Sequence, residues 1–264
     1  MDYVKIKDVI AAMIGTAVSL ILFSLLSPIT GRFSNPFVGN FIRQLIFAIL
    51  VFFTLIILKK TEIYEWDIYK VFDGWTSSFL FIGIMWLTGL QCMTVKVTEP
   101  PLNALLFALQ MLLVGYCEET LFRGLILNAF HGLFGNTPVA GARLAVLCSG
   151  VLFGATHLVN ALHPEIGLAN AAVQAAAASF LGIYFGAVYI RTGKCLWFVA
   201  LMHGVNDLLV SVSAGRLSDG TLSEGAIISS YSENGTERIL VAAVFYGVTT
   251  MIIMRRKKLL EVVE

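Results

Sequence analysis

The sequence predicts an all-α protein, a polytopic membrane helical bundle with about eight transmembrane helices. Of its 264 residues, 58% are hydrophobic and 13% are charged, whereas soluble domains have about 45–50% and roughly 25%. The apolar residues lie in long unbroken runs, while strands of a membrane barrel alternate apolar and polar residues. Only helices and closed barrels satisfy every backbone group in lipid. The runs therefore predict membrane-spanning helices.

The charge balance limits the classes of partner. The chain carries 18 Lys and Arg against 17 Asp and Glu, a net charge of +1. No strong positive field is present that could recruit a nucleic acid through its phosphates. We therefore expect no nucleic-acid partner, and the lipid bilayer as the surroundings of the chain.

Eight runs are long enough to cross a bilayer, which takes about 20 mostly apolar residues in a helix. They lie near Val9–Leu26, Phe41–Leu58, Trp75–Met93, Leu102–Phe130, Val139–Ala161, Gly167–Ile190, Leu196–Val212 and Ile239–Met254. The fourth is overlong and contains charged residues. Connections are short except for the polar stretch Ser213–Arg238, so we expect residues 1–264 to form a single domain.

The Lys and Arg residues predict the orientation, because short cytoplasmic loops are enriched in them. If both termini are cytoplasmic, twelve of the 18 fall on that side: Lys5, Lys7, Lys59, Lys60, Lys70, Arg143, Arg191, Lys194, Arg255, Arg256, Lys257 and Lys258. With one span fewer, the last four would lie on the opposite side. The predicted topology is eight spans with both termini cytoplasmic.

Charged residues interrupt the fourth run, although each costs about 2.5–3.5 kcal/mol to insert into a membrane. Glu119 and Arg123 are four residues apart, so on a helix they share a face and can pair. Glu118 is turned about 100° from Glu119 and can point into the bundle. One Arg neutralises one acid, so the second is excess negative charge and is suited to proton transfer. The alternative is a purely structural ion-pair network.

Two further spans carry polar residues at helical spacing. Phe153 and His157 are four residues apart in the fifth span, and His203 in the seventh is followed at i+3 and i+4 by Asn206 and Asp207. Either histidine alone is compatible with a packing role. Ionisable groups on three helices seek one another, however, because they would otherwise be unpaired in hydrocarbon. We therefore expect one shared polar site.

These three stretches, in this order, resemble the hallmarks of the CPBP (abortive-infection-like) family of intramembrane proteases, which includes the CAAX prenyl endopeptidases. The family pattern EExxxR, FxxxH and HxxxN/D is found here as Glu118-Glu119…Arg123, Phe153…His157 and His203…Asp207. The matching core extends from about residue 100 to residue 213. Each motif alone is weak, but all three in order on predicted spans make a specific match.

The resemblance implies an endopeptidase that hydrolyses peptide bonds of membrane-associated, prenylated or other peptide substrates in or beside the bilayer. It implies that Glu118 activates water with the assistance of His157, and that His203 and the polar residue at i+4 stabilise the oxyanion. Supporting roles are implied for Glu119, Arg123 and Phe153. We expect an integral protein of a bacterial plasma membrane.

The residues leave the need for a metal open. Glu118, His157 and His203 could hold Zn²⁺ with one position open for water. No HExxH motif is present, so the usual ligand pair on adjacent helical turns is missing. Without a metal, Glu118 itself would take the proton from water.

The third motif departs from the commoner family pattern, because its i+4 residue is Asp207 and not Asn. An ionised Asp accepts hydrogen bonds but cannot donate them to an oxyanion. Either Asp207 is held protonated, or it orients His203, or the neighbouring Asn206 donates instead.

Two other functional classes compete with a protease. One is a non-catalytic membrane scaffold or bacteriocin-immunity-type protein that keeps the polar cluster as structure. The other is an ion-coupled transporter, since acids and histidines in spans also form proton relays. Transporters usually contain two related halves, whereas the polar residues here crowd into the fourth, fifth and seventh predicted spans, which disfavours that interpretation.

Overall fold

The computed structural model describes residues 3–65, 67–162, 166–218 and 235–263, and these residues form helices without any strand. Seven helices are long and apolar enough to cross a membrane, and a bent helix pair makes an eighth candidate. In order they are α1 (Tyr3–Thr30), α2 (Pro36–Leu58), the bent pair α3 (Ile68–Ser77) and α4 (Phe79–Cys92), α5 (Pro101–Glu119) continued by η2 (Thr120–Leu127) and α6 (Asn128–Phe134), α7 (Pro138–Thr156) continued by η3 (His157–Leu162), α8 (Gly167–Arg191), α9 (Leu196–Ser213), and α11 (Gly235–Ala242) continued by η4 (Ala243–Gly247) and α12 (Val248–Ile253). Two short helices, η1 (Thr61–Tyr64) and α13 (Arg256–Val263), complete them. The predicted polytopic helical bundle is confirmed.

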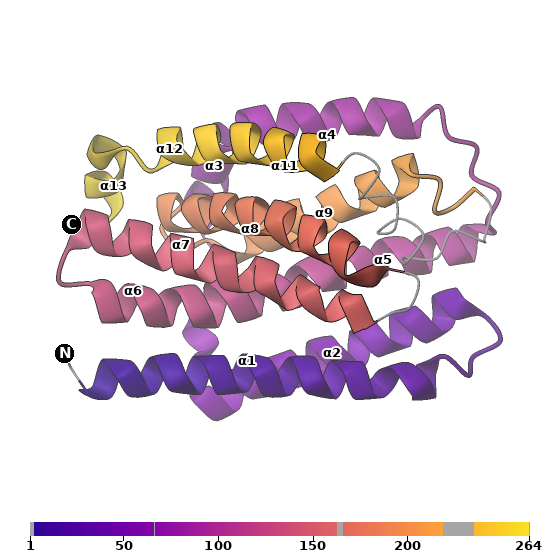
Figure 1. Ribbon diagram of the computed structural model, residues 1–264, viewed down its shortest axis with the longest axis horizontal. Helices are drawn as coiled ribbons and strands as arrows, with labels where there is room; N and C mark the ends of the chain where they lie inside the picture. Colours follow the sequence, from indigo (N-terminus) through magenta and orange to yellow (C-terminus); the bar gives the residue numbers. More distant parts are fainter. Residues whose placement is uncertain (1–2, 66, 163–165, 219–234, 264) are drawn as a thin grey trace.

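The long helices lie side by side along one axis, and the chain reverses direction at each connection (Figure 1). The start of α1 and all of α13 lie at the same end of the bundle (Figure 1), which we call the α13 end. Two contacts join elements there: Lys5 Nζ lies 3.4 Å from Asn136 Oδ1, and Arg143 Nη2 donates to the carbonyl of Met254 at 2.8 Å. A chain that starts and finishes at one end has crossed the bundle an even number of times. This agrees with eight spans.

The third predicted span, Trp75–Met93, is not one straight helix. It consists of the end of α3 and of α4, whose axes differ by 78°. The break lies at Ser78, whose N–H bonds to the carbonyls of both Gly74 and Trp75. The 14 residues of α4 extend about 21 Å, less than the roughly 30 Å of hydrocarbon. In contrast to the uniformly apolar α4, α3 has both a polar and an aromatic face, so a position across the bundle end suits it better than burial in lipid.

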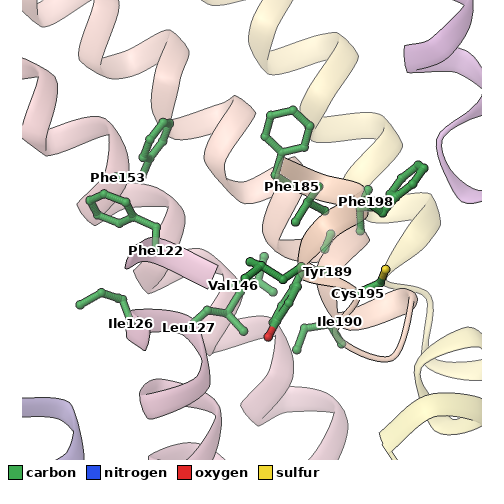
Figure 2. Close-up of a cluster of buried hydrophobic side chains, with 14 of the residues drawn as sticks. Phe122, Ile126, Leu127, Val146, Phe153, Phe185, Tyr189, Ile190, Cys195 and Phe198 are labelled. Carbon is green, nitrogen blue, oxygen red and sulfur yellow. The ribbon is translucent and has the colours of Figure 1, made fainter. Parts of the chain in front are cut away.

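The π-helix η2 lies at the centre of the bundle, and all eight of its residues are buried. Figure 2 shows part of the surrounding core, in which Phe122 of η2 lies beside Phe153 of α7. Their rings meet edge to face, with centroids 5.1 Å apart. Large apolar side chains also cover the outside of the bundle, such as Trp86, which is 65% exposed. In a soluble protein such a surface would aggregate, but in a membrane it contacts lipid.

Glycines bring α5 and α9 unusually close together. A Cβ atom on Gly204 of α9 would lie 2.7 Å from the carbonyl oxygen of Met111 and 2.8 Å from Leu112 Cα, and one on Gly115 of α5 would lie 2.5 Å from the Gly204 nitrogen. Real Cβ atoms do not approach other atoms this closely, so the contact requires glycine on both helices. Small residues at such crossings are typical of membrane helices, where backbone packing drives association. This crossing holds the acidic stretch of α5 beside His203.

Candidate active site

The innermost part of the polar cluster is a chain of three buried side chains. Arg123 Nε lies 3.0 Å from Glu119 Oε2, and the other carboxylate oxygen, Oε1, lies 2.7 Å from Nδ1 of His203. The side chains of Glu119 and Arg123 are fully buried, and that of His203 is 3% exposed. The predicted Glu119–Arg123 pair is confirmed. The carboxylate also joins α5 to α9, which the sequence alone did not predict.

Arg123 has further contacts with α7 and α8. Its Nη2 donates to the backbone carbonyl of Gly182 at 2.9 Å, and its guanidinium lies 4.8 Å from the centre of the Phe153 ring and 5.9 Å from that of Phe185. Guanidinium groups interact favourably with aromatic faces. Phe153 therefore stabilises the buried cation. The sequence did not predict these two contacts. Gly182 contacts Arg123 only through its backbone carbonyl, which any residue has, and Phe185 lies within an apolar run.

The helix changes its winding directly after Glu119, where α5 gives way to the π-helix η2. Short π-helical segments inside α-helices often mark functional sites. The side chain of Ser149 on α7 donates to the carbonyl of Phe122 at 2.8 Å. It satisfies a carbonyl within the widened helix and fixes α7 against this segment.

The outer part of the cluster consists of Glu118 and Asp207, which both face the other ring nitrogen of His203. Nε2 lies 3.6 Å from Glu118 Oε2 and 3.4 Å from Asp207 Oδ2. The side chains of Glu118 and Asp207 are 26% and 29% exposed. The cluster therefore consists of a buried part, Glu119 and Arg123 behind Nδ1 of His203, and two accessible carboxylates that face Nε2.

The three carboxylates determine how His203 can interact with them. Carboxylates accept hydrogen bonds, so an N–H group on each ring nitrogen would satisfy all three. The contact at Nδ1 is a full hydrogen bond, whereas the two at Nε2 are longer than the usual 2.7–3.2 Å for N–H···O. Neither accessible carboxylate therefore holds Nε2 in a full hydrogen bond.

His157 lies at the start of η3, where α7 ends. Its Nδ1 is 3.1 Å from the carbonyl oxygen of Phe153. Since the carbonyl can only accept, Nδ1 carries the proton in the neutral ring and Nε2 is the basic nitrogen. The Phe153 ring meets the rings of both His157 and His203 edge to face, at 5.0 and 5.8 Å. Phe153 thus contacts both histidines of the predicted site.

Asn206 lies beside the accessible carboxylates and contacts one of them. Its Nδ2 is 3.3 Å from Oδ1 of Asp207, and the other oxygen of Asp207 faces His203. Asp207 thus contacts both Asn206 and His203.

The zinc set suggested by the sequence does not fit the geometry. Within the described part of the chain, no three His, Cys, Asp or Glu side chains are grouped so that they could hold a metal ion. Glu118 and His203 face each other, but Nδ1 of His157 lies 3.1 Å from the Phe153 carbonyl oxygen of its own helix. We therefore derive no step through a metal.

Comparison with known proteins identifies the part of the chain that contains this cluster. Residues 100–209 match the family model of type II CAAX prenyl endopeptidases, Rce1-like. This part of the chain is similar to the CPBP/CAAX intramembrane proteases. No curated protein and no solved structure gives a significant match. All three motif stretches, from Glu118 to Asp207, lie within the matched range, so the family resemblance and the polar cluster concern the same residues.

The similarity to this family agrees with the architecture. A CAAX-type intramembrane protease is an integral membrane protein, and seven to eight candidate spans are present. Its substrate is a peptide or a membrane protein in a lipid bilayer. The family implies proteolytic activity, which makes the cluster around His203 the candidate active site.

Proposed function

We propose that this protein is an intramembrane endopeptidase in which Glu118 activates a water molecule for attack on a peptide bond. One observation carries the proposal: of the two adjacent glutamates, Glu118 is the accessible one, and it faces Nε2 of His203 across 3.6 Å. A general base must be reachable by water and substrate. Glu119 is fully buried and has two partners, so it does not meet that requirement.

The proposed reaction uses only side chains of this chain. Glu118 takes a proton from water, and the resulting hydroxide attacks the carbonyl carbon of the scissile bond. The developing oxyanion accepts a hydrogen bond from Nε2–H of His203, and one such donor contributes about 2.7–4 kcal/mol to transition-state stabilisation. The C–N bond then breaks as the proton passes from Glu118 to the departing amine, with Nε2 of His157 assisting this transfer.

The remaining residues act through His203. Glu119 accepts from Nδ1, fixing the ring so that Nε2 points to the accessible side, and Arg123 balances the charge of Glu119. Asp207 orients the ring from the other side, and its own position is supported by Asn206. The interactions of these residues with one another support this division of roles.

The first substrate class to test follows from the description of the matching family. CAAX prenyl endopeptidases act, as their name states, on prenylated peptides that end in a CAAX sequence. A lipid-modified peptide would also reach an active site inside the bilayer from the membrane. We therefore propose a membrane-anchored peptide as substrate, with hydrolysis near its lipidated end.

Wild-type protein and the Glu118→Ala variant, purified in the same detergent, provide the test. Both are incubated with a farnesylated CAAX peptide and a library of unmodified peptides, and products are identified by mass spectrometry. Cleavage by wild type and its absence in the variant are expected. If neither protein cleaves any peptide, the scaffold interpretation is favoured, and if both cleave equally, Glu118 is not the base.

A further inference from the structure

A polar cavity lies at the α13 end of the bundle, separate from the candidate active site. Its volume is about 490 Å³, within the range of about 300–1,000 Å³ found for ligand pockets. Gly124 and Leu125 of η2 line it, whereas Arg123 of the same helix contacts α7 and α8. The cavity and the active site therefore lie on different faces of η2, and no residue of the proposed active site lines the cavity.

Four lysines from four different parts of the chain line this cavity: Lys5 of α1, Lys60 after α2, Lys70 of α3 and Lys194 after α8. Lys5 bonds to the side chain of Asn136. Among the residues that the structure describes, no carboxylate is within ion-pair distance of any of the four. Ammonium groups that share a recess without an ion-pair partner attract an anion.

The lining suggests the charge of that anion. Three carboxylates, of Asp8, Glu62 and Glu65, also line the cavity and are themselves exposed. The four lysines exceed these carboxylates by one positive charge, which a phosphodiester would neutralise. Lysine binds phosphate oxygens as a point charge with three donors. Apolar side chains of Ala12, Ile63 and Leu125 line the same cavity, so it also suits an amphiphilic molecule.

Helix α3 indicates where the cavity lies relative to the bilayer. Tyr69, Phe72 and Trp75 recur every third residue and are 79%, 66% and 57% exposed, while Lys70 of the same helix lines the cavity. Exposed Tyr and Trp gather where a membrane meets water. Because α3 is bent by 78° from α4, we expect its aromatic residues to lie along the membrane surface. This level is that of the lipid headgroups.

We propose that the cavity lined by Lys5, Lys60, Lys70 and Lys194 binds the phosphodiester headgroup of an anionic phospholipid. Basic recesses between membrane helices at one end of a bundle are known sites for acidic headgroups. A free phosphate ion has the same chemistry, but the position of α3 at headgroup level and the apolar part of the lining favour the lipid. The proposal depends neither on the catalytic role of Glu118 nor on which side of the membrane the α13 end faces.

The test measures binding of phosphatidylglycerol to the full-length protein by native mass spectrometry from detergent. The cavity variant combines Lys60→Gln, Lys70→Gln and Lys194→Gln. A matched control combines Arg256→Gln, Lys257→Gln and Lys258→Gln, which removes the same charge from exposed residues at the same end of the bundle. Phosphatidylcholine and millimolar inorganic phosphate are added separately as competitors.

We expect one phosphatidylglycerol bound per wild-type chain and retained in the control. Each lysine near a headgroup strengthens binding about fivefold, so the cavity variant should bind roughly 100-fold more weakly. Neither competitor should displace the lipid. Equal binding by the cavity and control variants, or displacement by inorganic phosphate, would overturn the proposal. If the triple variant does not fold, each single Lys→Gln variant should show the fivefold loss, and its absence in all three would count equally against it.

Discussion

Replacing Glu119 by Gln should destabilise the protein, whereas the same replacement of the adjacent Glu118 should leave it folded but inactive. The two residues are neighbours in sequence, yet their surroundings differ. Glu119 is fully buried and contacts both Arg123 and His203 at 3.0 and 2.7 Å. Glu118 is 26% exposed, and its ion-pair contact with His203 is 3.6 Å long.

The expected magnitudes follow from these contacts. Glu119→Gln leaves the buried Arg123 without its counter-charge, and breaking a buried pair from one side costs about 3–5 kcal/mol. For a chain of this size that lowers the melting temperature by on the order of 10 °C. Glu118→Gln loses no contact of hydrogen-bond length and removes an excess charge, so stability should be unchanged or slightly higher. Loss of a general base typically reduces the rate by about 10²–10⁴-fold.

The assay combines thermal denaturation and cleavage of the same peptide for both variants in one detergent. Glu99→Gln serves as a control, because Glu99 accepts a hydrogen bond from Asn103 at 2.7 Å but belongs to no part of the polar cluster. The control should retain wild-type activity. Rapid cleavage by Glu118→Gln would refute its role as base. A Glu119→Gln variant that is inactive but as stable as wild type would mean that the two glutamates have the opposite roles.

Three further predictions concern topology, metal dependence and helix packing. Reporters fused before α1 or after Lys258 should both locate to the cytoplasm, because basic residues concentrate at that end, and an external C-terminus would contradict the eight-span topology. Activity should survive strong chelators, and the purified protein should contain no stoichiometric zinc. If zinc is instead present, His157→Ala and His203→Ala should each abolish it. Gly204→Ala should separate α9 from α5 and reduce cleavage at least tenfold, roughly the effect of a misaligned site. Its control Gly83→Ala, where a Cβ would meet no atom within 4 Å, should leave cleavage unchanged, and equal activity of both would show that the close crossing is unnecessary.

The sequence alone determined the architecture, because the insertion of apolar helices depends mainly on composition and length. Each of the eight apolar runs corresponds to a helix or helix pair. The sequence missed the bend between α3 and α4, since a 19-residue apolar window cannot distinguish a straight helix from two short helices at an angle. The change at Ser78 depends on local hydrogen bonds and on the amphipathic character of α3, both weak signals beside hydrophobicity.

Local helix geometry also determined the pairing of Glu119 with Arg123, because residues four apart meet on any helix. The pair is present in the structure even though the α-helix changes to a π-helix between Glu119 and Arg123. The three motif stretches could be identified as one site because ionisable groups in lipid need partners.

Only the tertiary structure decided which partners they found. The bond from His203 to Glu119 joins residues 84 positions apart, and it depends on the glycine crossing of Gly115 and Gly204, which no helical periodicity reveals. The carbonyl of Gly182 is available to Arg123 only because α8 packs there. The exposure that distinguishes Glu118 from Glu119 is likewise set by neighbouring helices. The spacing of residues in the sequence determines which side chains share a face of one helix. Burial and the distances between helices depend on how all the helices pack together.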